Sequence, residues 1–391
     1  MFKIQTLNKI DKEGLQVFPA SSYEITGEIS EPDAIVLRSF NMHDMNIPGS
    51  VKAIARAGAG VNNIPIAKCT EKGIVVFNTP GANANGVKEL VIAGLLLASR
   101  DIIGGVNWAK TLTDEGDKVP ALIEKGKANF GGSEIKGKTL AVIGLGAIGV
   151  LVANAAQSLG MHVVGYDPYI LVEHAWNLHR DIVRARSIES LLAKADFVTL
   201  QIPLMSETNG FIDSEKIKLM KDGVKILNFA RGELVVDADI KSALETGKVE
   251  AYFTDFPNAE LLKMNKVVAI PHLGASTNES EVNCAIMAAE QIRNFFENGN
   301  IRNSVNFPAA EMDRNNGARL LVTNKNIPNI ISQISTILAQ AGINIDNMLN
   351  KNKGDIAYNI IDTSNKVLSE DIINKVKSIE GVFMVRTLQA K

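Results

Sequence analysis

Short apolar runs alternate with stretches of helical spacing along most of the chain. In the first hundred residues the apolar runs are 34–37, 51–55 and 73–77. From Lys138 onward the alternation is more regular, with strand-like runs at 139–143, 162–167, 197–200, 224–228, 251–253 and 266–270. Strands separated by helices of roughly ten to fifteen residues are typical of parallel, doubly wound sheets. The pattern therefore predicts an α/β protein with two such sheets.

Two longer helical patterns, 87–100 and 278–297, bracket the second block of strands. In the later one the apolar residues recur at the spacing of one helix face. We interpret both helices as crossings between domains. This arrangement predicts a discontinuous, flavodoxin-like first domain, residues 1–98 with 279–307, and a second domain over residues 99–278.

The pattern of apolar and polar residues changes after residue 297. Residues 298–308 are rich in Gly, Asn and Pro, as linkers are. The patterns in residues 318–391 then give strand, helix, strand, strand, helix, strand. This βαββαβ order is that of the ferredoxin-like split unit. We expect a third, smaller domain over residues 315–391.

Composition narrows the classes of partner. The 391 residues include 41 Lys and Arg against 43 Asp and Glu, a formal net charge of −2. This balance argues against nucleic acid and against a polybasic membrane anchor, and leaves small anionic ligands open. Cys69 and Cys284 are too few for a disulfide framework and lack metal-ligand spacing, so no metal is expected. The start of the sequence shows no apolar run of signal-peptide length, and the longest apolar stretches, 90–98 and 141–153, fall short of a bilayer span, which predicts a soluble, cytoplasmic protein.

Three glycines, Gly144, Gly146 and Gly149, follow the strand 139–143 and open the next helix, and Asp167 ends the next strand. In such a turn the first glycine permits the tight bend, the second lets a pyrophosphate approach the helix N-terminus, and the third lets helix and strand pack closely. A carboxylate at Asp167 accepts hydrogen bonds from ribose hydroxyls and repels a 2′-phosphate. We therefore predict a Rossmann domain that binds NAD rather than NADP. The alternative is a turn that serves packing alone.

Three polar residues in the same block are candidates for chemistry. Arg231 and His272 each follow a predicted strand, at the edge where doubly wound sheets bind ligands, and Glu260 lies in an irregular loop. Arginine clamps carboxylates, histidine moves a hydroxyl proton near neutral pH, and a glutamate beside it stabilises its charged form. Spacing alone is equally consistent with a purely structural role for His272 and with an Arg231 side chain that faces solvent.

Three segments carry a family resemblance: 228–232 (Asn-Phe-Ala-Arg-Gly), 253–255 (Phe-Thr-Asp) and 271–277 (Pro-His-Leu-Gly-Ala-Ser-Thr). They resemble the D-isomer-specific 2-hydroxyacid dehydrogenases, and the resemblance extends over residues 1–307. It implies that Arg231 orients the substrate carboxylate, that His272 is the general acid/base and that Glu260 supports the histidine. The loop 255–271 is shorter than in many relatives and lacks their Glu-Pro pair.

The resemblance also implies a set of cofactor contacts. Asp255 resembles the residue that hydrogen-bonds the nicotinamide carboxamide. The full set comprises Thr79, Gly144, Gly146, Ala147, Ile148, Gly149, Asp167, Thr208, Phe229, Ala230, Arg231, Asp255, His272, Leu273, Gly274 and Ala275.

The form of segment 271–277 is similar to that of the branch of the family that oxidises 3-phospho-D-glycerate to 3-phosphooxypyruvate at the start of L-serine synthesis. Candidates for binding this substrate, besides Arg231 and His272, are Arg38, Ser39, Arg56 and Gly58. Either of the arginines Arg38 and Arg56 would serve equally as a surface ion pair. The alternatives are a dehydrogenase for another D-2-hydroxy acid (hydroxypyruvate, glycerate or lactate) and an NAD-sensing binding protein like the C-terminal-binding-protein corepressors.

The last 75 or so residues resemble an ACT domain, a regulatory module attached to many enzymes of this family. The resemblance implies an L-serine effector site at Asn326 and Asn344. Asn324 and Asn329 depart from the residues common in relatives, so a module that only pairs subunits is an equal alternative. We expect a homodimer or homotetramer.

Overall fold

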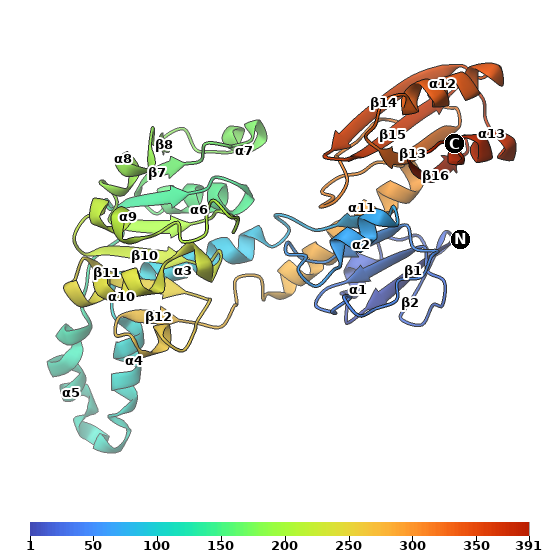
Figure 1. Cartoon of the computed structure of the whole chain (residues 1–391). Coiled ribbons are helices and arrows are strands. Elements are labelled where there is room, and N and C mark those ends of the chain that lie inside the picture. The colour runs from blue at the N-terminus through green and yellow to red at the C-terminus, as the bar shows by residue number, and fades with distance from the viewer. Residues whose placement is uncertain (391) are drawn as a thin grey trace. The chain divides into compact units, whose positions relative to one another are not determined.

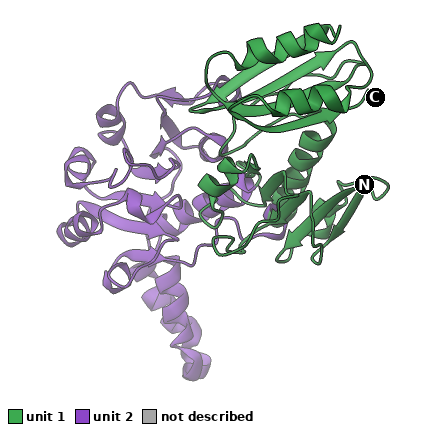
Figure 2. Ribbon diagram, turned by 45° about the vertical axis from the view of Figure 1, so that its right-hand side comes forward, with its two compact units in different colours: residues 1–82, 281–391 green, residues 83–280 purple. Residues whose placement is uncertain are grey.

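A computed structural model describes residues 1–390, which contain three β-sheets (Figure 1). The chain divides into two units (Figure 2): unit 1 is Met1–Ala82 with the segment from Glu281 onward, and unit 2 is Asn83–Ser280. Within residues 1–390, no helix is both long and apolar enough to cross a membrane.

The first sheet of unit 1 is parallel and has the strand order β2-β1-β3-β4-β5. This 2-1-3-4-5 order is that of flavodoxin-like folds, as predicted. The strands are β1 (Phe2–Leu7), β2 (Tyr23–Thr26), β3 (Ala34–Leu37), β4 (Ala53–Arg56) and β5 (Val75–Phe77), with the short helices α1 (Lys12–Leu15) and α2 (Ile66–Glu71). Helix α11 (Asn278–Asn298) contributes Phe295 and Phe296 to the core of this sheet, where they contact the rings of Phe2 and Phe77.

The sheet of unit 2 is parallel throughout, with the order β12-β11-β10-β9-β6-β7-β8. Its strands are β6 (Thr139–Ile143), β7 (His162–Tyr166), β8 (Val183–Arg184), β9 (Phe197–Leu200), β10 (Val224–Asn228), β11 (Val249–Thr254) and β12 (Val267–Ala269). The order reverses between β6 and β9. In doubly wound sheets the ligand crevice lies beyond the carboxyl ends of the strands at such a reversal.

Helices cover both faces of this sheet. Helices α3 (Ala84–Ser99) and α6 (Ala147–Ser158) share one apolar core with the strands, and α8 (Ile188–Leu192), α9 (Ser214–Leu219) and α10 (Asp237–Thr246) share the other. A short helix α7 (Val172–Trp176) follows β7. Helix α3 belongs to unit 2, whereas the predicted boundary at residue 98 left it with the first domain. The reason is its packing: a Cβ on Gly94 would lie only 3.0 Å from the Phe229 ring, so α3 sits directly on the sheet of unit 2.

Between α3 and β6 the chain forms a helical arm that the sequence patterns do not predict. It consists of α4 (Ile102–Lys110), η1 (Thr113–Lys118), α5 (Val119–Gly126) and η2 (Lys127–Phe130). The arm projects from the rest of unit 2 (Figure 1), and none of its residues is buried. Ile102, Ile103 and Val106 are exposed on α4.

The C-terminal sheet of unit 1 is antiparallel, with the order β14-β15-β13-β16. It consists of β13 (Arg319–Lys325), β14 (Ile345–Lys353), β15 (Ile356–Thr363) and β16 (Val382–Leu388), with α12 (Ile330–Gln340) and α13 (Glu370–Lys377). The chain order confirms the predicted βαββαβ unit. Helices α12 and α13 form one apolar core with buried residues of this C-terminal sheet. Three other residues of the sheet, Leu321, Tyr358 and Ile360, belong to the core of the first sheet.

Candidate active site

The glycine turn lies where the order of the parallel strands reverses. Gly144 has φ +93°, in the left-handed region that favours glycine, and a Cβ there would lie 2.5 Å from the Gln201 carbonyl oxygen after β9. A Cβ on Gly149 would collide with the Gly144 carbonyl. Around Gly146, at the N-cap of α6, a Cβ would meet nothing within 4 Å. Packing within the protein therefore accounts for two glycines, and the third leaves open space at the helix N-terminus, which fits a pyrophosphate.

Asp167 is held beside this turn by two backbone amides. The Leu145 N–H donates to Oδ2 at 2.9 Å and the Tyr169 N–H donates to Oδ1 at 2.8 Å. A carboxylate has about four acceptor positions, so two remain for other donors. This arrangement fits a carboxylate oriented to accept hydrogen bonds from ribose hydroxyls, as the sequence predicts.

Arg231 and His272 lie on the same aromatic side chain. The Arg231 guanidinium carbon is 5.9 Å from the centroid of the Phe256 ring, and the His272 ring centroid is 4.6 Å from that centroid. Arg231 follows β10, Phe256 follows β11 and His272 follows β12, so three adjacent strands bring these residues together at the carboxyl edge of the sheet. The sequence predicts the pair, and the structure brings it together on Phe256.

Sequence reasoning missed both Phe256 and Asn228. The Asn228 side-chain amide donates to the Arg231 carbonyl at 2.8 Å and to the Tyr252 hydroxyl at 3.2 Å, and its Oδ1 accepts from the Ala230 N–H. Asn228 is fully buried, so these bonds fix the turn that carries Arg231. The signal in the sequence was a polar residue at the end of an otherwise apolar strand.

Asp255 is a buried acid at the end of β11 with no hydrogen bond of normal geometry to either carboxylate oxygen. The residue is 1% exposed. Burial raises the pKa of the Asp255 carboxyl, against the opposing effects of His272, the Gly274 N–H and Arg231. An unsatisfied buried carboxylate is costly unless a ligand supplies the missing donors. The site thus fits a group such as a carboxamide, which donates through its NH₂.

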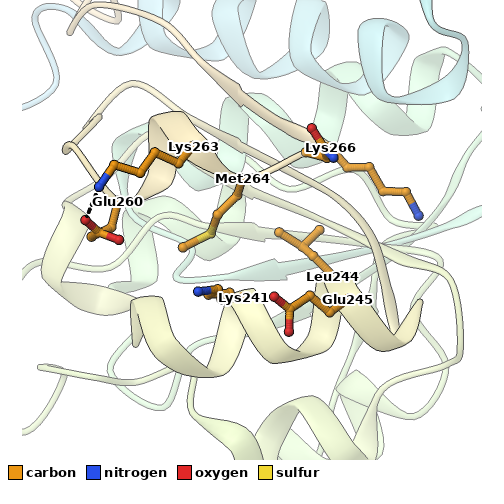
Figure 3. Close-up of a pocket in the computed structure, with 8 residues that line it drawn as sticks. Lys241, Leu244, Glu245, Glu260, Lys263, Met264 and Lys266 are labelled. Atoms are coloured by element: carbon orange, nitrogen blue, oxygen red, sulfur yellow. Dashed lines mark hydrogen bonds and ion pairs between the residues drawn. The ribbon is translucent and has the colours of Figure 1, made fainter.

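The Glu260 carboxylate is paired within its own loop. It pairs with Lys263 at 2.6 Å, and the two side chains are 66% and 70% exposed (Figure 3). They line a pocket together with Lys241, Leu244, Glu245, Met264, Asn265 and Lys266. The cause is local: Asn258 Oδ1 accepts from the Glu260 and Leu261 N–H groups, and Leu261, which begins η4 (Leu261–Lys263), is buried. The structure therefore differs from the expectation that Glu260 supports His272.

Within unit 1, two arginines lie at the carboxyl ends of neighbouring strands. The Arg38 guanidinium pairs with Glu281 at 2.5 Å, and the Arg56 Nε donates to the Arg38 carbonyl at 3.0 Å. Gly58, with φ +155°, lies against the Arg56 guanidinium, and Ser39 is exposed nearby in the chain. Thr79 is fully buried, and burial raises the pKa of the Cys284 thiol.

The remaining predicted contacts have varied surroundings. Ala147 and Ile148 form the first turn of α6, and Gly274 is buried between an exposed Leu273 and a half-buried Ala275. Phe229 and Ala230 lie in the turn after β10. The Thr208 hydroxyl is occupied locally, because it donates to the Pro203 carbonyl at 2.7 Å and accepts from the Met205 N–H.

The asparagines named for the C-terminal domain differ in their exposure to solvent. Asn326 and Asn344 are both exposed, and their side-chain amides donate to the Gly354 carbonyl and to Asp346. Asn324 is buried and its Oδ1 accepts from Asn359 at 2.6 Å, so this side chain belongs to the interior of the sheet.

The chain has clear relatives. Residues 96–274 match the D-isomer specific 2-hydroxyacid dehydrogenase, NAD binding domain. The D-3-phosphoglycerate dehydrogenase of Archaeoglobus fulgidus is 36% identical over 323 residues, 78% of this chain and 58% of that protein. That of Bacillus subtilis is 32% identical over 331 residues, 80% of this chain and 60% of that protein. The chain thus spans little more than half the length of these relatives.

Among solved structures, the NAD⁺-bound 3-phosphoglycerate dehydrogenase of Entamoeba histolytica is similar, with a TM-score of 0.60 and 28% identity. The match covers 78% of this chain and 98% of that one. The chain is therefore similar to the D-isomer-specific 2-hydroxyacid dehydrogenases, whose NAD-binding domain is matched by residues 96–274.

Proposed function

We propose that this protein catalyses the NAD-dependent oxidation of 3-phospho-D-glycerate to 3-phosphooxypyruvate, the first step of L-serine synthesis. The observation that carries the proposal is the placement of Arg231 and His272 on the Phe256 ring, at the same sheet edge as the glycine turn. The names of the relatives support the choice of substrate, since the two proteins from Archaeoglobus fulgidus and Bacillus subtilis described above are D-3-phosphoglycerate dehydrogenases.

Each residue has a defined task in this reaction. The Arg231 guanidinium binds the substrate carboxylate through paired N–H donors and orients C2. The His272 ring takes the proton of the C2 hydroxyl while the C2 hydrogen leaves as hydride, and the C2–O bond becomes a carbonyl. Bound NAD⁺ supplies the hydride acceptor. Phe256 fixes the direction of both side chains and keeps water from that face of the histidine.

The residues that would hold the cofactor come from the glycine turn and the strand ends. Gly146 leaves room for the pyrophosphate, Asp167 accepts from the ribose hydroxyls, and Asp255 accepts from the carboxamide. The orphaned oxygens of Asp255 and the open space at Gly146 support these assignments.

Arg38 and Arg56 are the proposed phosphate ligands. Both follow strands of a parallel sheet, where ligands of such folds bind. Arg38 pairs with Glu281, and Arg56 lies beside the glycine turn at Gly58, whose exposed backbone amides suit an anion. Ser39 adds a hydroxyl donor after Arg38.

Under the same proposal, the C-terminal sheet is an ACT domain, L-serine is a candidate effector at Asn326 and Asn344, and the enzyme is a cytoplasmic homo-oligomer. The exposed apolar residues Ile102, Ile103 and Val106 on the projecting arm support self-association, because contiguous exposed apolar surface usually marks a protein contact. Size-exclusion chromatography with light scattering measures the assembly, and I103D should lower the measured mass if α4 is the contact.

The test of the proposed function is NADH oxidation with a panel of 2-keto acids: 3-phosphooxypyruvate, hydroxypyruvate, pyruvate and glyoxylate, each with and without L-serine. We expect kcat/KM to be highest for the phosphorylated acid and to fall for it in R56Q. A preference for an unphosphorylated acid would instead identify a dehydrogenase for another D-2-hydroxy acid. NADH binding with no turnover on any member would identify an NAD-sensing protein.

A further inference from the structure

Two buried polar residues end neighbouring strands of the unit 2 sheet. Asn228 is the last residue of β10 and Thr254 is the last residue of β11. The two are partners in the register of this parallel pair, and neither is exposed. A buried polar side chain is costly unless its hydrogen bonds are made. Here the bonds go to the two turns that follow the strands, one of which carries Arg231 and the other Phe256.

Asn228 is connected to the Arg231 guanidinium through the backbone of the first turn. Its Nδ2 donates to the Arg231 carbonyl at 2.8 Å, and its Oδ1 accepts from the Ala230 N–H at 3.2 Å. The carbonyl of Ala230 in turn accepts from Arg231 Nη1 at 2.6 Å. The amide thus fixes the same stretch of backbone to which the guanidinium is bonded, so the direction of the guanidinium depends on Asn228.

Thr254 fixes the neighbouring turn in the same way. Its Oγ1 accepts from the Phe256 N–H at 3.1 Å, two residues further on, as Asn228 Oδ1 does in the first turn. The Phe256 ring centroid lies 5.9 Å from the Arg231 guanidinium carbon, within the range in which a cation is attracted to a ring. The turns also approach each other closely, because a Cβ on Gly232 would lie 3.2 Å from the Phe256 Cβ. The two strand ends together place the cation against the ring.

Tyr252 completes the hydrogen bonds of Asn228. The Asn228 Nδ2 has two hydrogens, and its second acceptor is the Tyr252 hydroxyl at 3.2 Å, on a side chain that is also buried. With both donors and the acceptor engaged, one orientation of the amide satisfies all its partners. Burial raises the pKa of Tyr252 to about 12, so the hydroxyl is neutral and this arrangement does not change with pH near neutrality.

We propose that Asn228 and Thr254 are positioning residues that orient the Arg231 guanidinium toward the substrate carboxylate, and that Tyr252 holds the Asn228 amide in place. The inference rests on the proposed role of Arg231 in binding that carboxylate. A planar guanidinium binds a carboxylate in a defined direction, whereas the ammonium of lysine is a flexible point charge. The positioning bonds should therefore matter much less in R231K than in the wild type.

A double-mutant cycle separates positioning from folding. In N228A we expect kcat/KM for the keto acid that the wild type reduces best to fall at least about tenfold, because a small displacement of an orienting group has an effect of this size. Y252F removes one hydroxyl and should lower kcat/KM about threefold. In the R231K background each change should lower it less than about twofold, whereas damage to the fold would act equally in both backgrounds.

A second measurement needs neither cofactor nor substrate. The Nε–Hε signal of Arg231 is followed by ¹H–¹⁵N NMR in ligand-free protein labelled with ¹⁵N-arginine, and it is assigned by its absence in R231K. Because the guanidinium lies on the Phe256 ring, the position of this signal reports how the two groups are arranged. We expect the signal to move in N228A, Y252F and T254V.

The matched control is N154A. Asn154 on α6 makes bonds of the same kind, since its Nδ2 donates to the Asn177 carbonyl at 2.8 Å and its Oδ1 accepts from the His179 N–H at 2.9 Å. Its loss should lower the Tm but leave kcat/KM and the Arg231 signal unchanged. If N228A does not fold, Y252F, which lacks a single oxygen atom, takes its place in both measurements.

An unmoved Arg231 signal in the folded variants, or equal losses of kcat/KM in the wild-type and R231K backgrounds, would overturn the inference. A moved signal without turnover on any keto acid would support the positioning of Arg231 and contradict the proposed function alone.

Discussion

The Arg319 guanidinium forms a two-point ion pair with the Asp362 carboxylate, with Nε–Oδ1 at 2.6 Å and Nη2–Oδ2 at 2.8 Å, and neither side chain is exposed. The remaining donors of Arg319 reach the carbonyls of Asn298, Met312 and Asp313. The pair thus joins two strands of the C-terminal sheet to the linker that leads into it. With Tyr358, whose hydroxyl donates to the Gly299 carbonyl at 2.7 Å, it fastens this sheet to α11 of unit 1.

We expect R319M and D362N each to destabilise unit 1 by about 3–5 kcal/mol, because each leaves its partner buried and charged without compensation. Thermal unfolding measures the loss. The matched control is R302Q, which removes an exposed pair with Glu311 at 4.0 Å and should change stability by less than about 1 kcal/mol. A loss for R319M no larger than for R302Q would contradict the assigned role of the pair.

The glycine turn offers a pair of substitutions with opposite expectations. In G149A the new Cβ collides with the Gly144 backbone, so we expect a lower Tm. In G146A the new Cβ meets no protein atom within 4 Å, so we expect an unchanged Tm but NADH binding at least about tenfold weaker, since the methyl takes the space of the pyrophosphate. Fluorescence titration with NADH and thermal unfolding measure the two effects. Normal NADH binding by G146A would show that the open space serves another purpose.

The parts of this fold that the sequence predicts are those fixed by local patterns. The parallel, doubly wound sheet of unit 2, the turn at Gly144 and the carboxylate at Asp167 follow from apolar runs and glycine spacing, which are local patterns. Phe256 was missed because its importance comes from two partners on neighbouring strands. The arm at residues 102–130 was missed because none of its residues is buried there, so no core constrains its pattern.

Glu260 shows that spacing along the sequence does not by itself determine the contacts of a side chain. Its distance in sequence from Arg231 suits the family, yet a short loop and the turn at Asn258 direct it to Lys263. A position in a shortened loop is set by the local turn rather than by the residue count from a distant motif. Asn324 is a similar case, since its hydrogen bond with Asn359 is set by the register of β13 and β15.

H272N is expected to lower kcat by several orders of magnitude while NADH still binds, because the histidine acts on the hydroxyl proton and lies on an exposed part of the site. Stopped-flow turnover and NADH fluorescence distinguish the two properties. The control H43N removes a histidine of unit 1 that contacts the Asn62 carbonyl, and it should leave turnover near that of the wild type. Near-normal turnover in H272N would remove this residue from the reaction.

The burial of Asp255 also has a consequence for stability. Because burial raises the pKa of this carboxyl in the folded protein, the folded state resists its ionisation more than the unfolded chain does. The contribution of Asp255 to the free energy of unfolding is therefore most favourable at low pH, where the acid is neutral. This contribution falls as the pH rises from the ordinary aspartate pKa, about 3.9, through the raised pKa of the folded protein. Asparagine is neutral throughout, so D255N should match the wild type near pH 4 and exceed its Tm by about 2 °C or more at pH 8.

Thermal unfolding of D255N, E260Q and the wild type across this range measures the effect. E260Q removes an exposed ion pair, so its Tm difference from the wild type should be small and should not grow from pH 4 to pH 8. A D255N protein that is less stable than the wild type at pH 8 would mean that the ionised carboxylate is satisfied within the fold. The opposite result means that the protein keeps a destabilising acid, as expected when a group is retained for binding a ligand rather than for folding.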